Sequence, residues 1–65
     1  MRVWKIEACR DEERITSRWG YALTETAREA RALAAATSGL PHNWAHEKHP
    51  DMLWPGRPGE RVHWG

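Results

Sequence analysis

The first residues of the chain alternate between apolar and polar side chains with a period of two. Two sets of side chains would lie on opposite faces of an extended segment: Trp4, Ile6 and Ala8 on one, and Val3, Lys5 and Glu7 on the other. Successive side chains of a strand point to opposite faces, so this alternation is typical of a half-buried strand. The pattern predicts a strand over residues 2–8.

A second alternating run follows the polar segment 10–13. Its large side chains share one parity: Ile15, Trp19, Tyr21 and Leu23. Two strands this close in sequence are expected to pair as an antiparallel hairpin. We expect Trp4, Trp19 and Tyr21 to lie in the core. The solvent face of the hairpin would then carry Lys5, Glu7, Arg14, Thr16 and Arg18.

The clearest local signals belong to a helix after the hairpin. Thr24 and Thr26 are both acceptable N-caps, and Glu29 stands three residues after Thr26, as in a capping box. Gly39 followed by Pro41 is a stop signal, because glycine accepts the left-handed conformation and proline cannot continue a helix. The expected apolar stripe consists of Ala27, Ala30, Leu33, Ala34 and Thr37.

The remaining residues, 41–65, contain all 4 Pro and all 4 His of the chain. Met52–Trp54 and Arg61–Trp64 can form two short strands of a ribbon, and the alternative is an irregular tail packed by its tryptophans. The sequence therefore predicts one α+β domain over residues 1–65. An antiparallel hairpin packs on one helix within 1–40, and a Pro/Gly/Trp-rich extension over 41–65 can add a β-ribbon.

A chain of 65 residues can build only a thin core, and such chains often depend on a disulfide, a metal or a partner for stability. Cys9 is the only cysteine, which excludes a disulfide within the chain and favours a reducing compartment. Neither a secretory signal nor an apolar run of membrane-spanning length is present in the sequence. We expect a cytoplasmic protein with no membrane partner.

The balance of 10 basic and 9 acidic residues gives a net charge of +1. Such a balance lacks the one-sided field expected of a dedicated nucleic-acid binder. The unusual features are 5 Trp without any Phe, and a preference for Arg over Lys. Trp and Arg are both over-represented at the hot spots of protein interfaces.

Three histidines close in sequence, His42, His46 and His49, raise the question of a metal site. On a helix, His42 and His46 would share a face, yet Pro41 and Pro50 bracket the segment. Exposed loop histidines, a structural zinc site and a pH-sensitive polar cluster remain open. We assign no metal ligand and no cofactor to the sequence.

No catalytic constellation is evident in the sequence. Cys9 lies near Arg10, but no histidine can be assigned to it as a base. The acidic residues 11–13 are flanked by arginines, as in a solvated turn, and no paired carboxylates are indicated. We expect a protein that is not an enzyme.

Two classes of macromolecular partner remain. Single-stranded nucleic acid would need the aromatic side chains on an open sheet face, which the expected burial of Trp4 and Trp19 disfavours. A protein partner, or a second copy in a homodimer, fits better, with an open sheet edge or an Arg-anchored surface. The predicted partner-binding residues are Lys5, Arg14, Arg18, Arg28 and Arg31.

The chain also resembles a known class of proteins in its build. Its size, and a hairpin-plus-helix layout in which Thr24–Ala30 opens the helix, are similar to those of the small inhibitors that phages and mobile elements encode against bacterial defence, the anti-CRISPR proteins in particular. The resemblance covers roughly the first 40 residues and carries over no functional residue. It implies an inhibitor that blocks a protein surface of a CRISPR-type effector complex. A net charge of +1 excludes mimicry of nucleic acid by an acidic surface.

Overall fold

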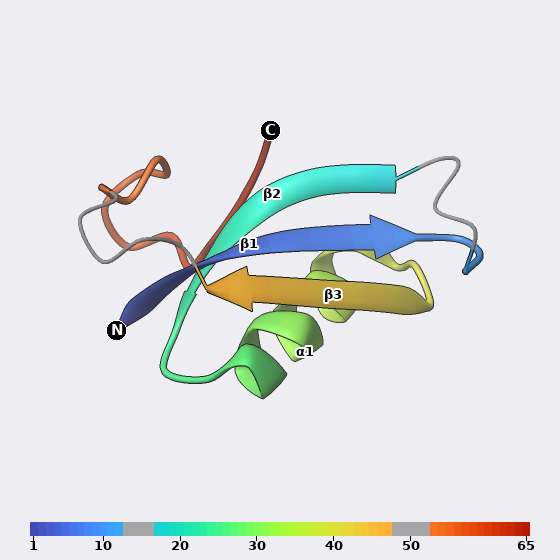
Figure 1. Cartoon of the computed structure of the whole chain (residues 1–65). Helices are drawn as coiled ribbons and strands as arrows, with labels where there is room; N and C mark the ends of the chain where they lie inside the picture. Colours follow the sequence, from blue (N-terminus) through green and yellow to red (C-terminus); the bar gives the residue numbers. More distant parts are fainter. Residues whose placement is uncertain (13–16, 48–52) are drawn as a thin grey trace.

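The computed structural model describes residues 1–12, 17–47 and 53–65. Five elements follow one another along the chain: β1 (Arg2–Cys9), β2 (Ser17–Thr24), α1 (Ala27–Ser38), β3 (His42–Glu47) and β4 (Val62–Trp64). The strands form one 4-stranded sheet, and α1 packs against one of its faces (Figure 1). The expected α+β class is confirmed.

The order of strands across the sheet is β3-β1-β2-β4, and all neighbours are antiparallel. The predicted hairpin therefore forms the centre, and the extension after residue 40 supplies both edges. The ribbon expected within the extension is different in the structure. Residues 53 and 54 are not in a strand, and β4 pairs with β2. Met52 lies outside the described residues.

Strand β3 was not expected from the sequence. Its residues His42–Glu47 include no β-branched side chain, so the local signal for a strand is weak. Tertiary pairing provides what the local sequence lacks, because β3 lies along β1 with Ala45 opposite Ile6. Ala45 packs at the rim of the core cluster that contains Ile6.

The register of the hairpin decides which side chains face the helix. Trp4 lies opposite Ala22, and Ile6 lies opposite Gly20. Directly opposite residues share a face of the sheet, so the core face of β2 carries Gly20, Ala22 and Thr24. The parity expected for the second strand is therefore wrong: Trp19, Tyr21 and Leu23 lie on the face away from α1. Trp4 is in the core as expected, with 7% of its surface exposed.

Small residues face the helix because the elements approach closely there. Ala22 on the sheet and Ala30 and Ala34 on α1 are completely buried. At Gly20, a Cβ atom would lie 2.6 Å from the carbonyl oxygen of His63 and 2.8 Å from the indole of Trp64. Trp64 therefore packs across Gly20, and a larger side chain has no room at that position.

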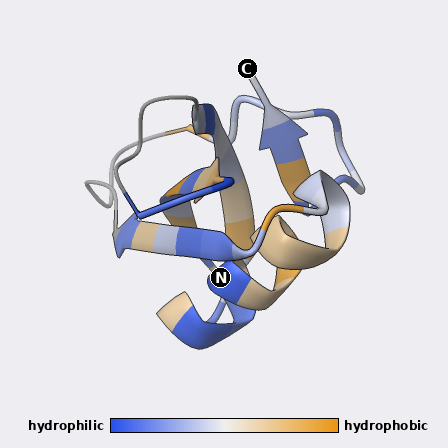
Figure 2. Cartoon of the chain, turned by 90° about the vertical axis from the view of Figure 1, so that its right-hand side faces the viewer, coloured by the Kyte–Doolittle hydropathy of each residue, from blue (hydrophilic) through white to orange (hydrophobic). Residues whose placement is uncertain are grey.

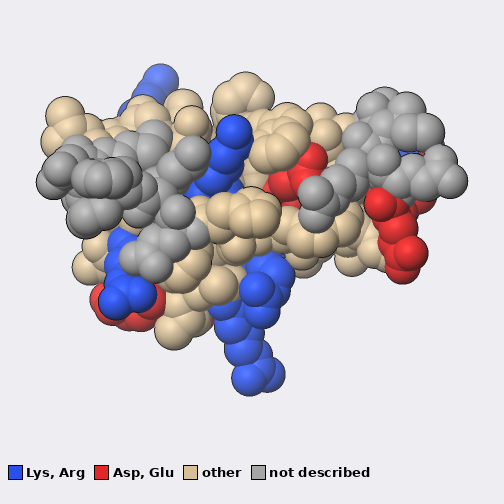
Figure 3. All heavy atoms as spheres, viewed as in Figure 1, with Lys and Arg blue, Asp and Glu red and all other residues tan. Residues whose placement is uncertain are grey.

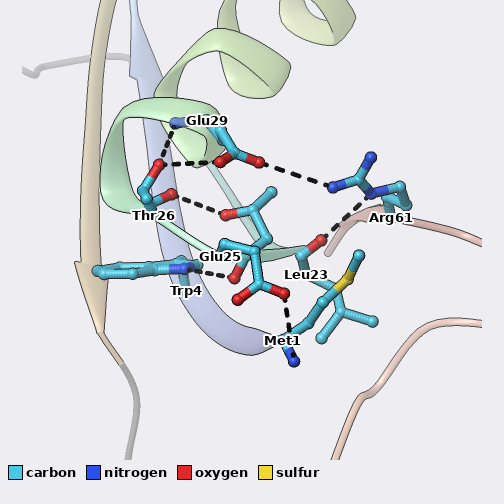
Figure 4. A network of polar contacts seen from close by, with 8 residues as sticks. Met1, Trp4, Leu23, Glu25, Thr26, Glu29 and Arg61 are labelled. Carbon is cyan, nitrogen blue, oxygen red and sulfur yellow. Dashed lines mark hydrogen bonds and ion pairs between the residues drawn. The ribbon is translucent and has the colours of Figure 1, made fainter.

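The helix begins and ends as predicted. The backbone N–H of Glu29 donates to Thr26 Oγ1 at 3.2 Å, and Gly39 has φ of 72°, with its N–H donating to the carbonyl of Ala35. Figure 4 shows this N-terminus beside Trp4, whose indole N–H donates to the carbonyl oxygen of Thr24 at 3.2 Å. The cap and the core are thus tied together at one end of the sheet.

The expected apolar stripe of α1 is confirmed at its centre. Ala30 and Ala34 are buried, Ala27 and Leu33 are half-buried, and Thr37 is exposed. Thr37 still contributes to packing, because its hydroxyl accepts a hydrogen bond from the Trp64 indole at 2.9 Å. The apolar residues of α1 and the alternating hydropathy of the strands can be followed in Figure 2. None of the described residues form a helix that is long and apolar enough to cross a membrane.

Candidate binding face

The sheet has one face covered by α1 and one face that no described helix covers. In Figure 1 the helix lies behind and below the strands, so the uncovered face is turned toward the viewer. The cross-strand registers place a group of large side chains on it. We call this group the aromatic face; its members are Lys5, Glu7, Trp19, Tyr21, Trp44 and His46.

The central strand β1 carries the charged groups of the aromatic face, and the flanking strands carry the rings. Glu7 lies directly opposite Trp19 of β2 and Trp44 of β3. One row along, Lys5 lies opposite Tyr21 and His46. Neighbouring strands are about 4.8 Å apart, so Trp19 and Trp44 flank Glu7 at a spacing of about 10 Å. In Figure 3, tan atoms prevail in the central part of the view, with a blue and a red group among them.

Trp19 is the most prominent ring of the aromatic face. Its side chain is 44% exposed. This exposure is unusual, because Trp is the largest of the apolar residues and the core of this protein is small. The Lys5 ammonium lies 4.5 Å from the ring centroid of Trp19, within the range of a cation–π interaction. Lys5 thus orients the indole while leaving much of it accessible.

Glu7 gives the aromatic face a negative group at its centre. Only 2% of its surface is exposed, because it lies between the two tryptophans on the neighbouring strands. The Glu7 side chain therefore lies within the aromatic face and not on its outer surface.

The two described histidines of β3 do not form the helical pair that a metal site would need. His42 and His46 are four residues apart on a strand, which separates them by about 13 Å. His42 instead stacks near Trp44, with ring centroids 6.3 Å apart. His49 lies outside the described residues, among which no group of three or more His, Cys, Asp or Glu could hold a metal ion.

Cys9 ends β1 and is completely buried. The register places His42 directly opposite it, a neighbour that the sequence could not assign because β3 was unexpected. A thiol without exposed surface is not accessible to a substrate. The juxtaposition of Cys9 and His42 therefore provides no usable nucleophile in this fold.

The structure does not gather the predicted partner-binding residues on one surface. Lys5 belongs to the aromatic face, whereas Arg18 has the opposite parity, and its guanidinium carbon lies 4.7 Å from the Trp64 ring centroid. Arg28 and Arg31 are exposed on α1. Arg14 lies outside the described residues. Lys5 therefore lies on the opposite side of the sheet from Arg18, Arg28 and Arg31.

Sequence reasoning missed Trp44 and His46 as members of the site. A signal was present, because the small residues Asn43 and Ala45 alternate with the large rings of His42, Trp44 and His46. That alternation has the period of a strand, and it places Trp44 and His46 on one face. Recognising it required knowledge that the segment pairs with β1.

A shallow depression also exists beside the helix, lined by Glu29, Ala32, Leu33 and Arg61. The guanidinium of Arg61 lies 3.9 Å from the Glu29 carboxylate, and its Nε donates to the carbonyl oxygen of Leu23 at 3.4 Å (Figure 4). The guanidinium of Arg61 at the depression is therefore already in contact with Glu29 and Leu23. These contacts fasten the segment before β4 to the rest of the fold.

Comparisons of the chain with protein-family models, curated proteins and solved structures found no match.

Proposed function

We propose that this chain is a non-enzymatic binding protein whose aromatic face binds a protein partner. The observation that carries the proposal is the position of Trp19, Tyr21 and Trp44 on the sheet face away from α1, with Trp19 44% exposed. Trp and Tyr are enriched at the centres of protein interfaces, where they bury a large area with little loss of conformational freedom. An exposed aromatic surface of this kind is typical of an interaction site.

The charges of the aromatic face favour a protein over a nucleic acid. Among the described residues with this parity, Lys5 is the only Lys or Arg, and Glu7 lies one row away from it. Affinity for a polyanion grows with the number of phosphates that basic side chains neutralise. A single lysine beside a shielded carboxylate can neutralise few phosphates, so it adds little to the affinity for a nucleic acid. The core of a protein interface, in contrast, is depleted in charged residues.

Single-stranded nucleic acid is the second candidate, and a specific observation favours it. Trp19 faces away from the helix, and it shares this uncovered face with Trp44 and Tyr21. Bases stack on exposed aromatic rings irrespective of sequence, and Lys5 could approach a phosphate. The expected burial of Trp4 and Trp19 disfavoured this function; Trp4 is buried, whereas Trp19 is 44% exposed on the face away from α1.

The narrower part of the proposal concerns the class of protein partner. Similarity in size and in hairpin-plus-helix layout to anti-CRISPR inhibitors favours a cytoplasmic inhibitor that blocks a protein surface of a CRISPR-type effector complex. The proposed site for that contact is the aromatic face. The exposed Arg28 and Arg31 on α1 remain predicted anchors of a second, separate surface.

The test is affinity capture from a bacterial lysate that contains a CRISPR-type effector complex. Wild-type protein, Trp19→Ala and Ala36→Ser are immobilised in parallel, with and without nuclease and with chelator throughout; Ala36 is exposed on α1 and belongs to no proposed binding surface. We expect wild type and Ala36→Ser to retain an effector subunit and Trp19→Ala to lose it. Retention by Trp19→Ala would contradict a role for the aromatic face. Capture that disappears with nuclease, together with salt-sensitive binding of single-stranded oligonucleotides, would favour the second candidate.

A further inference from the structure

The backbone hydrogen bonds at the β4 edge reveal which groups point outward at the opposite edge. The N–H of Leu23 donates to the carbonyl of Arg61 at 2.8 Å, and the N–H of Gly65 donates to the carbonyl of Trp19 at 3.0 Å. The odd-numbered residues of β2 therefore bond toward β4. Hydrogen bonds alternate sides along a strand, so the even-numbered residues of β2 bond toward β1.

The same alternation continues across the sheet to β3. Even-numbered residues of β1 bond to β2, so Lys5 and Glu7 bond to their partners in β3, His46 and Trp44. The backbone groups of Asn43 and Ala45 consequently point away from β1. Because β3 is the last strand of the sheet, no described strand lies beyond these N–H and C=O groups.

The outer edge of β3 lacks several features by which strands usually avoid pairing with another chain. Edges are commonly protected by proline, by lysine, or by a bulge, and none of these occurs within His42–Glu47. The residues whose backbone faces outward are Asn43, Ala45 and, at the end of the strand, Glu47. The Asn43 side chain donates to the Leu40 carbonyl at 3.0 Å. Among the described residues, no partner occupies the outward N–H and C=O groups of Asn43 and Ala45.

The sequence of β3 is complementary to itself when two copies run antiparallel. The segment reads His-Asn-Trp-Ala-His, centred on Trp44. With Trp44 opposite Trp44 of a second copy, Asn43 lies opposite the copy's Ala45, and His42 lies opposite the copy's His46. Trp44 then occupies a non-hydrogen-bonded pair, where opposite side chains are closest and aromatic pairs stabilise a sheet. The register brings no like-charged Lys, Arg, Asp or Glu residues together over this segment.

We propose that this chain forms a symmetric dimer in which the outer edge of β3 pairs with β3 of a second copy, with Trp44 at the two-fold axis. Asn43 and Ala45 of each copy supply the backbone hydrogen bonds. The two β1 strands would then be separated by three strand spacings, about 14 Å. Since α1 packs against β3, β1 and β2 on one face, the two helices would lie on the same face of the joined sheet.

Dimerisation would unite the two aromatic faces into one continuous surface. Trp44 of each copy would lie at its centre, with the Trp19 residues farther out. The association would also stabilise a fold with a thin core, because it removes Trp44 and Ala45 from water. The inference concerns β3 alone and does not depend on which partner the aromatic face binds.

Sedimentation equilibrium of wild type and Ala45→Pro tests the pairing. Proline at residue 45 removes an outward N–H that β1 does not use, and proline is tolerated at such edge positions. We expect wild type to dimerise with concentration, and Ala45→Pro to raise the dimer dissociation constant at least about tenfold through loss of the edge hydrogen bonds. Trp19→Ala, which removes partner binding in the proposed function, should leave the dimer intact. A wild type that remains monomeric would overturn the proposal.

Cysteine scanning fixes the register independently of folding defects in the proline variant. In a Cys9→Ala background, Trp44→Cys places two thiols on the axis at a Cα separation of about 4.5 Å, which permits a disulfide. His46→Cys places them about 13 Å apart, which does not. We expect oxidation to crosslink only the Trp44→Cys variant, with both variants folded by circular dichroism. Equal crosslinking of both, or of His46→Cys alone, would contradict the proposed register.

Discussion

The two faces of the sheet differ in how closely their side chains are packed. The covered face packs Trp4 and Ile6 against small residues, Gly20, Ala22 and the buried alanines of α1, whereas the face away from α1 carries Trp19 and Trp44. In a chain with a thin core, large apolar side chains would be expected inside. The difference indicates that close approach of helix and sheet stabilises the fold, and that the aromatic area left at the surface is available for binding.

Shortening one side chain on each face of β1 should give the largest difference in stability between the two faces. Ile6 is completely buried on the covered face, so Ile6→Ala should lower the free energy of unfolding by about 3 kcal/mol through lost burial and the cavity that remains. Val3 on the other face is only half-buried, and Val3→Ala should lower it by less than about 1 kcal/mol. Urea unfolding measures both. Equal losses would mean that the two faces do not differ in packing.

A methyl group added at Gly20 tests the close packing of β4 across β2 on the covered face. Its Cβ would meet the His63 carbonyl oxygen and the Trp64 ring, so Gly20→Ala should lower the free energy of unfolding by about 2 kcal/mol. Gly65→Ala is the matched control, because its Cβ would have its nearest neighbour at 3.8 Å. We expect the control to change stability by less than about 0.5 kcal/mol in the same urea titration. A tolerated Gly20→Ala would show that β4 does not pack across β2 in this way.

The cap of α1 holds the helix on the covered face, and its removal should have a smaller effect. Thr26→Ala deletes the hydroxyl that accepts from the Glu29 N–H, and we expect a loss of about 1 kcal/mol. Thr26→Ser retains the hydroxyl and should restore most of the stability. Thermal unfolding by circular dichroism compares the two variants. Similar melting temperatures for Ala and Ser would indicate that the cap contributes nothing.

The smallest change in stability is expected for the most exposed tryptophan. Trp19→Ala removes a ring that is 44% exposed, together with its contact to Lys5, and should lower the free energy of unfolding by no more than about 1 kcal/mol. The same variant should lose the protein partner. A loss of several kcal/mol in urea unfolding would place Trp19 in the core and contradict its assignment to the aromatic face.

The parts of the fold that were predicted correctly depend on local signals. Thr26, Glu29 and Gly39 define the helix through contacts within a few residues of each other. The alternation in residues 2–8 likewise predicted β1, which the structure extends to Cys9. Helix caps and strand periodicity depend on residues within a few positions of each other, so both can be recognised from the local sequence.

The parts that failed depend on residues distant in sequence. The face of β2 was assigned from the size of Trp19 and Tyr21, whereas the structure decides it through Trp64, which packs across Gly20. β3 has little strand propensity of its own and forms against β1, far away in the chain. Of the predicted binding residues, Lys5 was placed correctly on the solvent side, but its neighbours Trp44 and His46 could not be found without that pairing.

The most direct test of the two-faced sheet is the response of individual indole N–H signals to a soluble paramagnetic agent in NMR spectra of the isotope-labelled protein. Trp4 is 7% exposed and its N–H donates to Thr24, whereas Trp19 is 44% exposed. The account predicts that the signal of Trp19 broadens several times more than that of Trp4. Equal protection of the two signals, or a Trp4 signal broadened more than that of Trp19, would contradict it.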